Sequence, residues 1–137
     1  RLAQYFITKI TDILANSLTN PTYQTTVSSL DFWCDWGDAR EYMKIIAEIA
    51  PRVGGEDLII ASGRTVWARD LVEQLFAIFD LDYRKHVIPA VEIDKDRMQN
   101  WRVDIAKLLT VYGGSPTISI LETCHEILHH KYNITEK

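Results

Sequence analysis

The chain has 137 residues, 47% of them hydrophobic and 25% charged, and a formal net charge of −4. This length and apolar content predict one domain over residues 1–137. The absence of a basic cluster argues against nucleic acid, and the short apolar runs argue against a membrane span. Cys34 and Cys124 form no CxxC pair and no signal peptide is recognisable, which favours reduced thiols and a cytoplasmic location.

Hydrophobic periodicity predicts five helices separated by short extended segments. In chain order, the predicted helices lie at residues 2–19, 35–50, 65–79, 104–111 and 117–131. The predicted extended segments lie at residues 25–29, 30–34, 58–61 and 83–88. Such an order of helices and strands is typical of an α/β domain.

Local signals refine these elements. The first helix should carry Leu2 on its apolar face, and Asp35 and Thr65 are the expected N-caps of the second and third helices. Residues 58–61 form a continuous apolar run between turn signals, which predicts a strand covered on both faces. His86 is expected to be exposed on its extended segment.

Tyr5 and Lys9 stand four residues apart in the first predicted helix. On one helix face, an ammonium can lower the pKa of a phenol so that the tyrosine acts as a base. Because this spacing is also frequent by chance, we interpret Tyr5 as a packing residue.

A second motif, HExxH, is formed by His125, Glu126 and His129. On a helix, two imidazoles one turn apart can share a zinc ion while the glutamate acts as general base. Only a few residues follow, however, and His130 points away from the shared face. The same segment also fits an amphipathic closing helix without a metal.

Six short segments carry a resemblance to a known family. They are Asp35-Trp36-Gly37 with Ala39 and Tyr42, residues 57–63, Val72-Glu73, Leu81-Asp82-Tyr83, Pro89-Ala90 with Glu92-Ile93-Asp94, and Asp104-x-x-Lys107 with Gly113 and Pro116. In order and approximate spacing they resemble the NAD-dependent nucleotide-sugar epimerases and dehydratases, which are extended short-chain dehydrogenases. The closest resemblance is to the C-terminal part of the GDP-mannose 4,6-dehydratase type, a lyase.

The resemblance implies a small α/β domain of short strands and about five helices, equivalent to the substrate-side portion of that fold. The family binds NAD or NADP in an N-terminal Rossmann core, which this chain lacks: no glycine-rich turn follows a strand here. The catalytic Ser/Thr, Tyr and Lys also belong to that missing half. We therefore expect no catalytic, cofactor-binding or metal-binding residue in this chain.

The resemblance carries over three substrate contacts, Thr8, Lys9 and Glu92, although each could equally be a solvated surface residue. Two arginines that hold the diphosphate in the family are replaced here by Cys34 and Ile88. Neither side chain can make the charge-assisted bonds by which a guanidinium binds phosphate. A nucleotide-sugar should therefore bind weakly.

Three functions remain open at this stage. The chain is either the substrate-binding portion of a larger nucleotide-sugar enzyme or a free-standing remnant that acts as a binding or interaction module. The third alternative, a small zinc hydrolase, rests on HExxH alone. The expected partner is a second copy or a separate N-terminal half, because the strand at residues 58–61 and its flanking helices (38–50 and 66–79) need covering.

Overall fold

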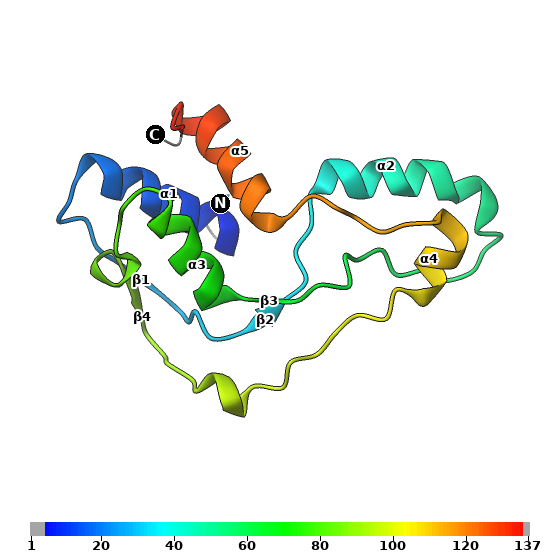
Figure 1. Ribbon diagram of the computed structural model, residues 1–137, viewed down its shortest axis with the longest axis horizontal. Coiled ribbons are helices and arrows are strands. Elements are labelled where there is room, and N and C mark those ends of the chain that lie inside the picture. Colours follow the sequence, from blue (N-terminus) through cyan, green and yellow to red (C-terminus); the bar gives the residue numbers. More distant parts are fainter. Residues whose placement is uncertain (1–4, 136–137) are drawn as a thin grey trace.

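The computed structural model describes residues 5–135 (Figure 1). Its helices are α1 (Phe6–Thr19), α2 (Ala39–Ile49), α3 (Ala68–Ala77), α4 (Ala106–Tyr112) and α5 (Ile120–Tyr132). Its strands are β1 (Thr25–Val27), β2 (Trp33–Cys34), β3 (Val66–Trp67) and β4 (Val87–Pro89), with 3-10 turns at Ala50–Arg52, Tyr83–Lys85 and Lys95–Arg97. Within the described residues, the predicted small α/β domain with five helices and short strands is confirmed. Leu2 lies outside them.

The strands form two separate pairs. β1 and β4 are parallel, with Thr25 opposite Val87 and Thr26 opposite Ile88. β2 and β3 are antiparallel, with Trp33 opposite Trp67. A parallel pair requires a long crossover connection, and here the chain runs through β2, α2, β3 and α3 before it returns to β1 as β4.

The larger part of the molecule, which we call the body, consists of α1, α3 and α5 with β1 and β4 (Figure 1). Its helices form because apolar residues recur on one face of each. In α3, for example, Leu71, Leu75 and Phe76 are almost completely buried. Burying one such side chain contributes about 1.5–3 kcal/mol, so this cluster is the main source of stability.

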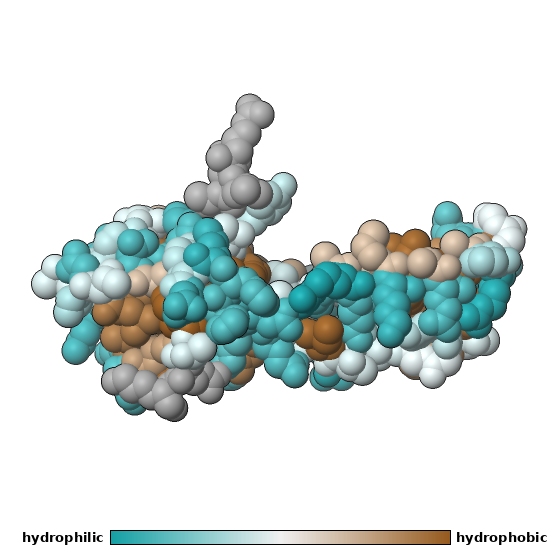
Figure 2. All heavy atoms as spheres, turned by 90° about the horizontal axis from the view of Figure 1, so that it is seen from above, coloured by the Kyte–Doolittle hydropathy of each residue, from teal (hydrophilic) through white to brown (hydrophobic). Residues whose placement is uncertain are grey.

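The smaller part, which we call the arm, consists of α2, α4 and the segment between α2 and β3, and extends away from the body (Figure 1). Ile45 and Ile49 of α2 pack on Leu108 of α4. The arm also leaves large apolar side chains exposed, among them Met43 and Ile59. Figure 2 shows hydrophobic atoms along one edge of the arm. The arm therefore carries an apolar surface that the described residues do not cover.

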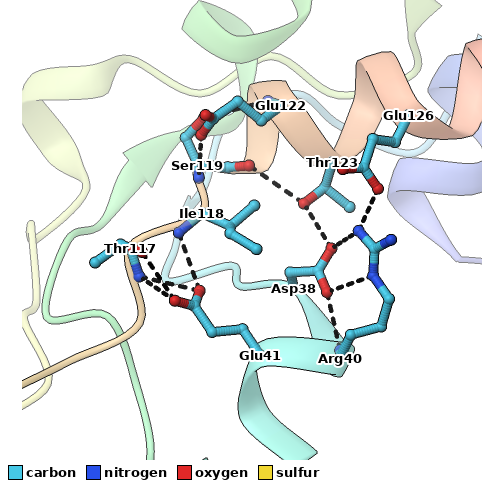
Figure 3. Close-up of polar contacts among 9 residues, drawn as sticks. All are labelled: Asp38, Arg40, Glu41, Thr117, Ile118, Ser119, Glu122, Thr123 and Glu126. Carbon is cyan, nitrogen blue, oxygen red and sulfur yellow. Dashed lines mark hydrogen bonds and ion pairs between the residues drawn. The ribbon is translucent and has the colours of Figure 1, made fainter. Parts of the chain in front are cut away.

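A network of side chains joins the start of α2 to α5 (Figure 3). Asp38 caps α2 by accepting from the Arg40 backbone N–H and is bound by the Arg40 guanidinium at 2.7 Å, which lowers the pKa of Asp38 to about 2. The same guanidinium pairs with Glu126 of α5. Glu41 accepts from the backbone N–H groups of Thr117 and Ile118, which precede α5. These contacts orient the arm relative to the body.

Two predicted elements differ from the structure in a way that packing explains. Residues 58–61 are extended, but no strand among the described residues pairs with them, and the Ile59 side chain is 62% exposed. A strand exists only where a neighbour supplies hydrogen bonds. The third strand in chain order is instead Val66–Trp67, at the start of the helix predicted from Thr65, because its backbone pairs with β2.

Four single-residue predictions were wrong. Thr65 does not cap α3, whose N-cap residue is Trp67; the Thr65 hydroxyl instead donates to the Asn100 side chain at 2.8 Å. Asp38 rather than Asp35 caps α2, while Asp35 accepts hydrogen bonds from the backbone and hydroxyl groups of Ser62. His86 is 3% exposed and its Nδ1 lies 2.8 Å from the Tyr23 carbonyl oxygen, because the β1–β4 pair brings these segments together. Tyr5, interpreted as a packing residue, is exposed at the start of α1.

Candidate functional site

The three predicted substrate contacts lie on two elements of the body. Thr8 and Lys9 are on α1, and the Lys9 ammonium donates to the Thr26 carbonyl oxygen of β1 at 2.8 Å. Glu92 follows β4, is largely exposed, and lies 3.5 Å from a guanidinium nitrogen of Arg69. Within residues 5–135, no hydrogen bond or ion pair joins Glu92 to Thr8 or Lys9. The β1–β4 pair is what connects the two positions.

A buried ion pair lies next to Glu92. Arg69 of α3 donates to both carboxylate oxygens of Asp31, at 2.8 and 2.9 Å. The backbone N–H of Ile93 donates to the same carboxylate at 2.8 Å. The hydrogen bonds from Arg69 are the main reason that the pKa of Asp31 is lowered, against the opposing effect of burial. This arrangement ties the segment that carries Glu92 to α3.

A cavity of about 440 Å³ opens at this ion pair. Its lining residues are Asp31, Trp67, Arg69, Asp70, Glu92, Ile93, Asp94 and Lys95. The Lys95 ammonium lies 5.2 Å from the ring centroid of Trp33 and 5.7 Å from that of Trp67, and pairs with Asp70 at 2.7 Å. Of the lining residues, six are charged, and Trp67 is aromatic but almost completely buried.

The charges around the cavity restrict the ligand chemistry. Four lining residues are acidic and two are basic, and Arg69 and Lys95 already pair with Asp31 and Asp70. A phosphate would meet an excess of carboxylates. Carboxylates accept hydrogen bonds from hydroxyl groups. The arrangement is suited to a neutral polyhydroxylated ligand.

The two positions where the family resemblance places arginines both lie on strands. Cys34 is half-buried in β2 and pairs with Val66 of β3, and burial raises the pKa of its thiol. Ile88 of β4 is exposed opposite Thr26, whose carbonyl oxygen holds Lys9. A guanidinium at residue 88 would therefore start from the strand beside the one whose Thr26 carbonyl oxygen accepts from Lys9 of α1.

The three residues of HExxH lie on α5, but the glutamate and the two histidines have different neighbours. Glu126 pairs with Arg40 in the junction of Figure 3. His125 and His129 line a separate cavity with Phe79. In the part of the chain that the structure describes, no three His, Cys, Asp or Glu side chains gather as a metal site would require.

Asp31, Arg69 and Lys95 were missed in the sequence. They lie far apart along the chain, and no motif unites them. One signal was available: Asp31 is a single carboxylate in a run of apolar and aromatic residues, where an unpaired charge would be costly. Such a residue predicts a buried cationic partner but does not identify it.

The fold matches parts of several solved structures. The Pseudomonas aeruginosa protein RMD, solved with NADPH, matches 92% of this chain with a TM-score of 0.74 and 19% identity. The Bordetella bronchiseptica enzyme WbmG, solved with NAD, matches 98% with a TM-score of 0.58 and 16% identity. A Burkholderia cenocepacia protein assigned provisionally as an epimerase matches 89% with a TM-score of 0.52 and 20% identity. No family model matches the sequence.

The chain spans 42%, 41% and 39% of the lengths of these three proteins. The chain thus has the fold of about two fifths of each of these proteins, two of which were solved with NADPH or NAD bound. Among the described residues, every helix is too short or too polar to cross a membrane. The structural likeness identifies a part of the fold of these enzymes in this chain.

Proposed function

We propose that this chain is the substrate-side, C-terminal portion of a nucleotide-sugar epimerase or dehydratase of the GDP-mannose 4,6-dehydratase type, working in the cytoplasm. The observation that carries the proposal is the likeness to the NADPH-bound RMD structure over 92% of this chain but only 42% of RMD. The six sequence segments that resemble the same family support it independently. On this proposal, the chain alone neither binds NAD nor catalyses a reaction.

The cavity beside Asp31 and Arg69 supports a role in sugar binding. Its carboxylates suit the hydroxyl groups of a sugar better than a phosphate. Lys9 of α1, whose ammonium donates to the β1 carbonyl oxygen of Thr26, is the cation that the proposal assigns to the diphosphate, with Thr8 beside it. Glu92 would accept from a sugar hydroxyl at the cavity mouth.

The exposed face of the arm supports the proposed partner, either a second copy of this chain or a separate N-terminal half. The backbone groups of residues 58–61 form no backbone hydrogen bonds within the described residues, and Met43 and Ile59 are exposed nearby on the arm. An extended segment with free backbone groups recruits another strand. Of the two partners, a closed homodimer is the one that the isolated chain can form.

Titration calorimetry with GDP-mannose tests the substrate. Each charge-assisted phosphate contact contributes about 1.5–3 kcal/mol, so the loss of two should weaken binding at least about a hundredfold. The double variant Cys34→Arg/Ile88→Arg should therefore bind measurably better than the wild type. Met43→Arg/Ile59→Arg adds the same two charges on the arm and should not improve binding. Equal binding by both double variants, or tight binding by the wild type, would contradict the assigned positions.

A binding or interaction module is the second candidate, favoured by the loss of both arginines at Cys34 and Ile88. Light scattering over a concentration series tests the partner that both candidates share. A homodimer should form in the wild type and dissociate in Ile59→Arg, which places a charge on the uncovered extended segment. A monomer at high micromolar concentration would leave a separate N-terminal half as the remaining partner. Binding of GDP-mannose by neither the wild type nor the double arginine variant would favour the module.

A further inference from the structure

A second cavity, of about 250 Å³, opens where α3, the first turn of α5 and the segment before β3 meet. Its lining residues are Trp36, Ser62, Arg64, Val66, Leu71, Gln74, Ser119, Ile120 and Leu121. None of these residues lines the cavity beside Asp31. The two cavities are therefore separate sites, and an inference about this one does not depend on the proposed function.

The walls of the second cavity are rigid and apolar. Leu71 and Ile120 belong to the buried core of the body. The Trp36 indole stacks on Phe6 with ring centroids 5.7 Å apart and an interplanar angle of 15°. Because packing fixes these side chains before any ligand arrives, a flat apolar group could enter at little cost in conformational entropy.

Among the described residues that line this cavity, Arg64 is the one with a cationic side chain. One guanidinium nitrogen, Nη2, donates to the carbonyl oxygens of Pro116 and Thr117 at 3.1 and 3.2 Å. Its backbone N–H donates to the Ser62 hydroxyl at 3.0 Å. Among the described residues, Nε and Nη1 make no hydrogen bond. The guanidinium is thus anchored through Nη2, while Nε and Nη1 each remain able to donate a single charge-assisted hydrogen bond to a carboxylate.

The surrounding charges disfavour a ligand with more than one negative charge. The Glu122 carboxylate interacts electrostatically with Arg64, and Asp35 lies behind Ser62, whose hydroxyl donates to it at 2.8 Å. The start of α5 adds no free anion site, because Ser119 and Glu122 form a reciprocal capping box. A phosphate dianion would be repelled by two carboxylates and attracted by one guanidinium.

We propose that this cavity binds a small monocarboxylate with an aromatic ring, the ring lying against Trp36 and Leu71 and the carboxylate on Arg64. The volume, about 250 Å³, lies slightly below the range of about 300–1,000 Å³ for ligand pockets, and therefore suits one single or fused ring. The exposed amide of Gln74 at the rim can contact a polar atom of that ring.

The test compares indole-3-acetate with indole-3-acetamide, which share the ring and differ in charge. Titrations of ¹⁵N-labelled protein followed by NMR should map the acid to the amides of residues 62–66 and 119–121. The acid should bind at least about tenfold more tightly than the amide, as expected for a charge-assisted pair worth about 1.5 kcal/mol or more.

Variants then assign the preference to one side chain. Arg64→Gln should bring the two affinities within about twofold, and Arg64→Lys should keep part of the preference because it keeps the charge. Arg84→Gln, which changes an exposed guanidinium on the far side of α3, should leave the preference unchanged. Equal binding of acid and amide by the wild type would overturn the proposal. Shifts confined to the arm, or a preference that survives in Arg64→Gln, would overturn it as well.

Discussion

Replacing Arg69 with methionine removes the guanidinium that neutralises Asp31 and keeps a long side chain to fill the space. The Asp31 side chain is 2% exposed and that of Arg69 is 25% exposed, so the carboxylate cannot replace its partner with bulk water. Of its three side-chain and backbone donors, only the Ile93 N–H would remain. The variant therefore leaves a buried charge with a single hydrogen bond.

Breaking a buried ion pair on one side costs about 3–5 kcal/mol. Because Arg69 is partly exposed and the Ile93 N–H remains, we expect the lower end, about 3 kcal/mol. Adding Asp31→Asn removes the stranded charge. The double variant should therefore be more stable than the sum of the two single changes predicts, by about 2 kcal/mol.

Urea unfolding at pH 7, followed by tryptophan fluorescence, measures these free energies of unfolding. The matched control is Arg84→Met, since Arg84 is 73% exposed in its pair with Asp82 and should lose no more than about 1 kcal/mol. A loss in Arg69→Met within error of this control would refute the reasoning. Additive effects of the Asp31 and Arg69 changes would refute it too.

The pH dependence gives an independent check on the same pair. Hydrogen bonds from Arg69 lower the pKa of Asp31 below its ordinary value. A carboxyl with a lowered folded-state pKa stabilises the fold above its unfolded pKa, about 4, and loses that contribution as the pH falls below it. The stability difference between wild type and Arg69→Met should be largest at about pH 8 and shrink as the pH falls, because burial favours protonation of the stranded Asp31 carboxyl in the variant and the wild type loses its ion pair in acid. A difference that widens in acid would contradict this sign.

Three further predictions concern other parts of the chain. Gly37→Ala should cost about 1–3 kcal/mol in urea unfolding, because the new Cβ would overlap the Tyr42 ring; an unchanged midpoint would show that Tyr42 moves freely. Glu41→Ala should cost about 1.5 kcal/mol by removing the acceptor of the Thr117 N–H, and Glu41→Gln should recover part of it. Metal analysis should find less than stoichiometric zinc and an unchanged Tm with chelator; stoichiometric zinc lost together with stability in His125→Ala would restore the hydrolase alternative.

Local sequence features predicted the helices because helix formation depends on neighbours three and four residues away. The apolar spacing in α1, α3 and α5 placed these helices within a few residues of their observed ends. The α/β class was likewise correct within residues 5–135, although the third strand is Val66–Trp67 and not the predicted segment 58–61. The predicted substrate contacts Thr8, Lys9 and Glu92 came from the family resemblance, and their role remains to be tested by binding.

Tertiary structure alone decided which distant residues meet. Asp31 and Arg69 are 38 positions apart, and they meet because β3, which leads into α3, pairs with β2, which follows Asp31. His86 is buried because β1 pairs with β4, whereas residues 58–61 are unpaired because no strand of the described chain lies beside them. A strand, a buried ion pair and a cavity each require two segments to approach. Their formation therefore depends on how the whole chain packs, which the order of residues along one segment does not reveal.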